Sequence, residues 1–258
     1  PMIKFFRKIR QKLLAKNKFS KYLIYAIGEI VLVVIGILIA LQINNWNEQQ
    51  KTKSNQEKYL TLLKTEAINN LNQVKKTKEA AKTMHLWQIK IFNLIDSYQD
   101  TITEDNLSKT FGKVFSETFK FRYENSVLTE IKSSGDLKNI RNDSLRNYLI
   151  ALDPLVLTIE YQEKSVIEEY DKSIEYIKKS GYLRTIADKN GIAERIGIPK
   201  SPKFKNSNIH LLSDNEFENN LIRYTGTTKN LVSYQYPRLE NHLKKIIEII
   251  ERELELKK

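Results

Sequence analysis

The chain has 258 residues, a formal net charge of +12 and no cysteine. The absence of cysteine excludes disulfides and thiol chemistry, and eight Gly and five Pro are too few for a turn-rich β fold. Eight of the 43 basic residues precede residue 22 and one of the 31 acidic residues is Glu29, which leaves 35 basic against 30 acidic residues after residue 43. The larger part of the chain is only mildly basic, so the net charge does not predict a nucleic-acid partner.

Residues 1–21 form a basic tail without an acidic residue. Its apolar residues Ile3, Phe6, Ile9 and Leu13 recur at helical spacing with cations between them. This pattern is typical of a short amphipathic helix on the anionic inner leaflet of a membrane. The residues expected to contact anionic lipid are Lys4, Arg7, Lys8, Arg10 and Lys12.

Residues 22–46 predict a transmembrane helix. The apolar run has about the 20 residues that span a hydrocarbon core. A buried core helix is the competing interpretation, but such helices seldom stay apolar on all faces for six turns. A cleaved secretion signal fits less well, because the run is too long and no small-residue cleavage site follows. Tyr22, Tyr25 and Trp46 are expected as interfacial anchors, and the basic tail predicts a cytoplasmic N-terminus.

One face of this span carries Glu29, Gly36 and Ala40, which are separated by steps of seven and four residues. Gly36 and Ala40 form a small-xxx-small pair that would let two helices approach closely in lipid. A carboxylate is costly in hydrocarbon, so Glu29 should face another helix or water. Two interpretations of Glu29 stay open: a neutral or snorkelling side chain, and a packing or proton-handling group at a helix–helix interface.

Residues 47–258 predict a periplasmic domain built as an elongated helical bundle, which makes the expected fold all-α. A repeat close to 3.6 residues from Leu60 to Ile95 predicts one long helix that can continue directly from the span. Residues 75–82 are poor in large apolar groups, so a bend or looser section is expected there. A loop and then a helix start are predicted over residues 96–106.

The remaining helices are predicted from the residues that cap or break them. A helix over residues 116–132 should end at Gly135, and Asn142 should cap the next helix, which Pro154 would break or restart. An amphipathic stripe then runs to Lys179, and Gly181 closes it. Residues 188–213 predict a surface loop. Beyond them, Asp214 is expected to cap a helix, and Pro237 to open or kink the last one.

Two stretches, Met2–Glu48 and more loosely Asn125–Leu149, resemble the recurring blocks of an uncharacterised family of single-pass membrane proteins from Bacteroidota. The family is known only as a domain of unknown function. The resemblance implies a bacterial inner membrane and a periplasmic domain, and it supplies no activity and no catalytic residues.

No P-loop, dinucleotide, nucleophile-elbow or zinc-protease motif is present. His85, His210 and His242 are isolated, and Glu168-Glu169 is expected on a solvated helix face. Most of the tyrosines near helical stripes are expected in the core or at partner contacts. We therefore expect no enzyme, no metal and no cofactor.

Two functions from different classes remain. The first is a self-associating envelope scaffold, sensor or partner-binding subunit that forms a homo-oligomer and contacts membrane lipids and an envelope protein. The second is an ion-channel-like or proton-motive-force-coupled assembly that uses Glu29, suggested by the layout alone. An enzyme with an unrecognised site is the third and weakest hypothesis.

Overall fold

The computed structural model describes residues 7, 19–97, 101–115, 118–199 and 206–256. These residues are helical or irregular, and no strand occurs among them. The helices are α2 (Phe19–Ile95), α3 (Glu104–Phe115), α4 (Ser126–Ser134), α5 (Asp143–Ser180), α6 (Leu183–Lys189), α7 (Ile192–Arg195), α8 (Asn215–Asn230) and α9 (Tyr236–Glu255). Short 3-10 helices, η2 (Asp136–Asn139) and η3 (Ile209–Ser213), and a π-helical turn, η4 (Leu231–Gln235), join them. The all-helical prediction is confirmed for the described chain.

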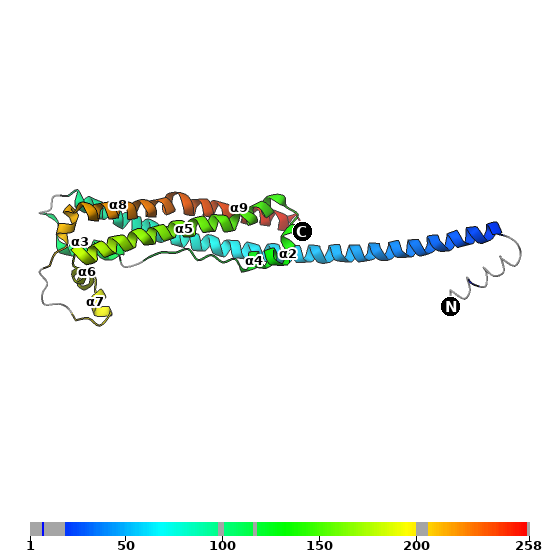
Figure 1. Cartoon of the computed structure of the whole chain (residues 1–258), viewed down its shortest axis with the longest axis horizontal. Coiled ribbons are helices and arrows are strands. Elements are labelled where there is room, and N and C mark those ends of the chain that lie inside the picture. The colour runs from blue at the N-terminus through cyan, green and yellow to red at the C-terminus, as the bar shows by residue number, and fades with distance from the viewer. Residues whose placement is uncertain (1–6, 8–18, 98–100, 116–117, 200–205, 257–258) are drawn as a thin grey trace. The chain divides into compact units, whose positions relative to one another are not determined.

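Two compact units divide the chain, Pro1–Lys58 and Tyr59–Lys258. The described part of the first unit is almost entirely the N-terminal portion of α2. In the second unit, the rest of α2 lies alongside α5, α8 and α9, with α3, α6 and α7 grouped at one end and α4 at the other (Figure 1). The apolar stripes of these helices face inward and form one core of buried Leu, Ile, Val and aromatic side chains.

The helix α2 confirms the prediction that the span continues without a break into the long helix. The looser section expected at residues 75–82 is not seen. This stretch stays α-helical, and Val74, Thr77 and Ala81 are buried. A lack of large apolar groups therefore does not mean a lack of packing, because small side chains can also be buried.

The predicted helix over residues 116–132 is wrong for residues 118–125, and residues 116–117 lie outside the described residues. Residues 118–125, which we call the strap, are irregular, and α4 begins only at Ser126. The strap has a period of two: Phe121 is buried and Phe119 and Tyr123 are half-buried, while the residues between them are exposed. That alternation is typical of extended backbone, and Asn70 holds the strap by accepting the N–H of Glu124 at 2.9 Å and donating to its carbonyl at 2.6 Å.

Most of the predicted helix ends are confirmed. Gly135 closes α4 in the left-handed region at φ 76°, where a side chain would be strained. Asn142 accepts the N–H of Leu145 at the start of α5, and Asp214 accepts the N–H groups of Glu216 and Phe217 at the start of α8. Gly181 ends α5 by donating to the carbonyl of Ile177.

Pro154 does not break α5, contrary to the prediction. A proline inside a helix removes the hydrogen bond to the carbonyl four residues earlier, here that of Ile150. Both Pro154 and Ile150 are exposed, so water can reach that carbonyl, while Leu152, Leu155 and Val156 stay in the core. Burial of the apolar stripe on both sides of the proline keeps the helix continuous.

Residues 188–199 and 206–213 are more ordered than the expected surface loop, and residues 200–205 lie outside the described residues. They include the end of α6, the single turn α7 and the 3-10 turn η3, whose Leu211 and Leu212 are buried. At the end of the chain, α9 carries Pro237 near its start, as expected, and the preceding turn η4 is π-helical.

Candidate functional site

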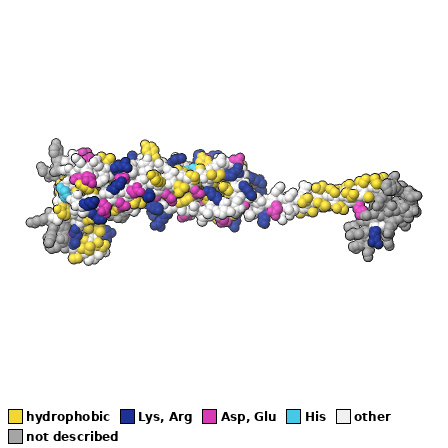
Figure 2. Space-filling view, viewed as in Figure 1, with side chains coloured by type: hydrophobic (Ala, Val, Ile, Leu, Met, Phe, Trp, Pro, Cys, Tyr) yellow, Lys and Arg dark blue, Asp and Glu magenta, His cyan; other side chains and the backbone are white. Residues whose placement is uncertain are grey.

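The candidate site is the apolar N-terminal portion of α2. An apolar stretch of α2 near the N-terminus has a mean hydropathy of 2.6, and no other part of the described chain buries it. The helix is therefore long and apolar enough to span a membrane. Its hydrophobic side chains form a continuous yellow stretch in Figure 2.

The structure brings Glu29, Gly36 and Ala40 onto one face because α2 is helical throughout. Seven residues turn an α-helix by about 700°, so Glu29 and Gly36 differ by roughly 20° in direction. They are about 10 Å apart along the axis at 1.5 Å per residue. Trp46 follows Ala40 by six residues and lies on a different side of the helix.

Glu29 is half-buried, and a surface hollow beside it is lined by Ala26, Glu29, Ile30 and Val33 among others. The other residues that line this hollow have hydrocarbon side chains. A carboxylate in such a place can pack against a polar group of another helix or exchange a proton.

Gly36 and Ala40 carry small or no side chains on the same face of α2. A Cβ added at Gly36 would meet no atom within 4 Å, and Ala40 is exposed. The small side chains are therefore not explained by packing within the described chain. They leave the backbone accessible to a partner helix.

The structure describes only some of the predicted interfacial anchors and lipid-contacting cations. Trp46 is 62% exposed and lines a second hollow with Leu38, Gln42 and Asn45. Arg7 is exposed. Tyr22 and Tyr25 lie in α2, but their side chains fall outside the described residues. Lys4, Lys8, Arg10 and Lys12 also lie outside the described residues.

The second unit contains a buried carboxyl group that sequence reasoning missed, Glu163 on α5. Its Oε1 accepts the hydroxyl of Tyr236 at 2.7 Å and the N–H of Phe121 at 2.8 Å, while Oε2 has no partner among the described residues. Burial raises the pKa of Glu163, and its two hydrogen-bond donors only partly offset that effect. Glu163 joins α5, α9 and the strap in the core.

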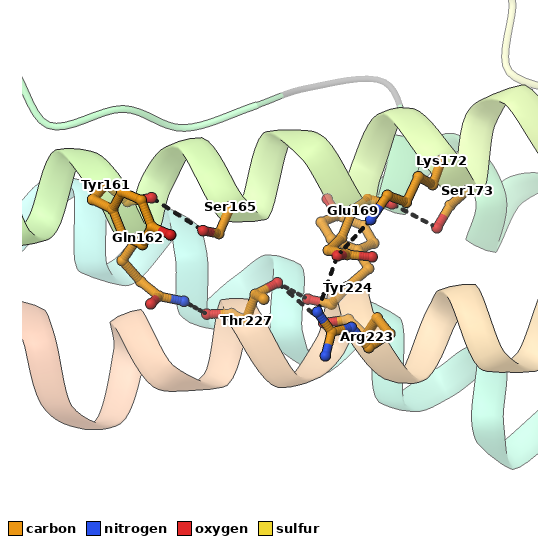
Figure 3. A network of polar contacts seen from close by, with 9 residues as sticks. All are labelled: Tyr161, Gln162, Ser165, Glu169, Lys172, Ser173, Arg223, Tyr224 and Thr227. Carbon is orange, nitrogen blue, oxygen red and sulfur yellow. Dashed lines mark hydrogen bonds and ion pairs between the residues drawn. The ribbon is translucent and has the colours of Figure 1, made fainter.

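The expectation that Glu168 and Glu169 are both solvated is wrong for Glu169. That side chain is 5% exposed and lies between Lys172 at 2.9 Å and Arg223 at 3.3 Å (Figure 3). Burial alone would raise the pKa of Glu169, but the two cations outweigh it and leave the pKa lowered. The ion pair between Glu169 and Arg223 joins α5 to α8. The side chain of Gln162, also on α5, donates to the carbonyl of Thr227 on α8.

The three histidines do not meet, as expected. The rings of His210 and His242 contact the backbone carbonyls of Ser180 and Tyr148, and burial lowers the pKa of His85. Among the described residues, no group of three or more His, Asp or Glu side chains could hold a metal ion. Tyr161 and Tyr182 are exposed, unlike most of the tyrosines expected in the core.

The position of the missed carboxylates on apolar helix stripes could have predicted their burial from the sequence. Glu163 lies four residues after Ile159 and three before Val166, which puts it on the apolar stripe of α5. Glu66 lies three residues after Leu63 and four before Asn70, on the inward face of α2, and is 8% exposed. An acidic residue in register with an apolar stripe predicts a buried, hydrogen-bonded carboxyl group.

Residues 29–182 match a family of unknown function, DUF6090. The matched stretch begins at Glu29, includes Gly36 and Ala40, and ends just after α5. No curated protein and no solved structure matches the chain.

Proposed function

The chain belongs to this family of unknown function, and we propose that it is a non-enzymatic, membrane-anchored helical protein that self-associates through the apolar portion of α2. The observation that carries the proposal is that this portion exposes its apolar side chains on every face. Each Å² of apolar surface left in water costs about 25 cal/mol. A lipid bilayer removes that cost, whereas the second unit already buries its own apolar stripes.

Self-association is supported by the face that carries Gly36 and Ala40. In lipid the hydrophobic effect does not drive helices together, so close backbone contact has to. Gly36 offers open space around its Cα and Ala40 is exposed, so a second copy of α2 could approach this face. We further propose that the protein lies in a bacterial inner membrane, with the basic tail cytoplasmic and the second unit periplasmic, where it contacts an envelope protein.

The test of self-association is the mass of the purified full chain in mild detergent. Wild type should be oligomeric, and Gly36→Leu combined with Ala40→Leu should shift it toward the monomer. Gly28→Leu is the matched control, because Gly28 also has no atom near its Cβ position and lies about 80° around the helix from Gly36. A monomeric wild type, or equal effects of control and test variants, would contradict the proposal.

Orientation has a separate test. A reporter enzyme that is active only in an oxidising periplasm, fused after Lys258, should be active in intact cells. The same fusion built with a reporter active only in the cytoplasm should be silent. The reverse pattern would reject the proposed topology while leaving self-association untouched.

The half-buried Glu29 supports a second candidate, an ion-channel-like or proton-coupled assembly. In a symmetric oligomer the same carboxyl group would recur around the axis, and intramembrane carboxyl groups commonly mark ion or proton pathways. Glu29→Gln keeps size and hydrogen bonding but cannot titrate. If Glu29 has a packing role, the Gln variant should assemble and support growth as wild type does. If it relays protons, assembly should persist while proton flux into proteoliposomes is lost.

A further inference from the structure

A second site lies inside the second unit, where α3, α5, α6 and α7 meet. A cavity of about 210 Å³ is present there. Its floor is formed by the buried side chains of Phe111, Phe115, Ile177 and Ile186. The rings of Phe111 and Phe115 meet edge to face at 5.8 Å. The floor therefore consists of apolar side chains that are packed into the surrounding core.

The wall of the cavity is less buried than its floor. Ile174, Ala187 and Ile192 are half-buried, and Leu183 is 39% exposed. Figure 2 shows hydrophobic side chains gathered on the surface near α7. The cavity is thus open on one side, through an apolar rim.

Specific contacts hold α6 against α3 at this place. The Nδ2 of Asn190 donates to the carbonyl of Ser108 at 2.7 Å and to that of Ile186 at 2.8 Å. The Asn190 side chain lies directly on Gly112, where a Cβ would come within 2.1 Å of its Oδ1. The bond to Ser108 joins the end of α6 to α3 beside the cavity, and the bond to Ile186 fixes the Asn190 side chain on its own helix.

The described lining residues contribute only apolar side chains and the glycine. A cavity of this kind does not hold water well, because a water molecule needs two to four polar partners. Its volume is larger than the roughly 150 Å³ of an engineered apolar cavity that binds benzene. A hydrocarbon group longer than one ring would fill it.

We propose that this cavity binds a single alkyl chain, the tail of a fatty acid or of an acylated molecule. An inserted methylene chain presents no donor or acceptor, which matches the lining, and its polar end can remain in solvent beyond the rim at Leu183. A ligand with polar atoms along its length would lose hydrogen bonds to water and recover none inside. The site is independent of the membrane helix and of its self-association.

The test uses the full chain in lipid nanodiscs, because detergent tails would compete for the cavity. The probe is decanoic acid that carries a diazirine near its methyl end, cross-linked by light and located by mass spectrometry. Adducts should concentrate on residues 111–115 and 174–192, and unlabelled decanoate should compete them away. A second arm places the same diazirine on a phospholipid tail in the disc, and adducts in the same peptides would identify a membrane lipid as the source.

Cavity-filling variants decide whether the labelling reports this site. Ala187→Phe places a ring in the cavity from α6 and should lower labelling by about tenfold, the effect of weakening binding by 1.4 kcal/mol. Ile174→Phe fills it from α5 and covers the case in which the first variant does not fold. Leu157→Phe, at a position that is 63% exposed on α5, is the control and should label as wild type does.

The outcomes are distinct. Adducts spread evenly over exposed apolar residues, or unchanged labelling in a folded cavity-filling variant, would overturn the proposal. A packing void without a ligand would show itself by higher thermal stability of Ala187→Phe together with no competable labelling of wild type. Competition by naphthalene at concentrations where decanoate fails would reject the alkyl chain in favour of an aromatic ring.

Discussion

The hydroxyl of Tyr236 donates to Oε1 of Glu163 at 2.7 Å in the core of the second unit. Both groups are buried, and Tyr236 is the first residue after the π-helical turn that joins α8 to α9. The contact therefore joins a buried carboxyl group of α5, which also binds the strap, to the first residue of α9.

Replacing Tyr236 by Phe should lower the free energy of unfolding by about 1–3 kcal/mol, because Glu163 loses one of its two donors. The loss should grow as the pH rises. Burial already raises the pKa of Glu163 above its ordinary 4.5, and removing the Tyr236 donor raises it further. A raised carboxyl pKa means that the folded state keeps its proton while the unfolded state loses it, so stability falls as pH increases through that window.

Denaturant unfolding of wild type and Tyr236→Phe across pH 5–9 measures this difference. Glu163→Gln is the control, since it cannot titrate and should remove the pH-dependent part of the difference. A Tyr236→Phe penalty that stays constant with pH would mean that Glu163 does not change protonation in this range.

Glu66 should act as the N-terminal cap of α4 from a distant helix. Its carboxylate accepts the N–H groups of Val127 at 2.7 Å and Leu128 at 3.2 Å, whereas Asn125, at the capping position, makes no side-chain cap. Glu66→Ala should cost about 1–3 kcal/mol by leaving these donors unsatisfied, and Glu66→Gln should cost less. Hydrogen exchange should show the loss of protection concentrated at the start of α4, and uniform loss across the unit would argue against a capping role.

Gly112→Ala should destabilise the contact between α3 and α6 by about 1–3 kcal/mol, as expected for an overpacked site. The new Cβ would collide with Asn190, whose amide bridges the carbonyls of Ser108 and Ile186. In the double variant with Asn190→Ala the collision disappears, so the two effects should not add. Gly226→Ala is the matched control in a helix: no atom lies within 4 Å of its Cβ position, and it should stabilise by up to about 1 kcal/mol. Thermal unfolding of the four variants measures both effects, and additive losses would exclude the collision.

Asp214→Ala should destabilise α8 by about 1 kcal/mol through loss of its N-cap. The hydroxyl of Tyr176 and the N–H groups of Phe217 and Glu216 lower the pKa of Asp214. A lowered carboxyl pKa gives stability that is present above the ordinary value of 3.8 and is lost as the pH falls below it. Asp214→Asn keeps the acceptor without the charge, so it should be less stable than wild type at pH 7, by a margin that shrinks as the pH falls to 2. Equal stability of the two at both pH values would show that the charge contributes nothing.

The sequence by itself determined the features that depend on neighbouring residues. The 3.6-residue repeat from Leu60 to Ile95 predicted the second part of α2, and the apolar run before it predicted the membrane-spanning length. Short-range chemistry located the starts of α5 and α8 at Asn142 and Asp214, and the left-handed Gly135 at the end of α4. Each of these signals acts over one or two helical turns, so it can be read without knowing the fold.

Only the tertiary structure decided the features that depend on distant contacts. The strap departs from the predicted helix because Asn70 and Glu163 bind its backbone, from 54 and 42 residues away. The start of α4 depends on Glu66, 61 residues from Val127. The buried Glu169 pairs with Arg223 of α8, and the cavity is lined by residues of α3, α5, α6 and α7 that packing brings together. These partners are fixed by packing between helices, which a local pattern cannot encode because it carries no information on which faces meet.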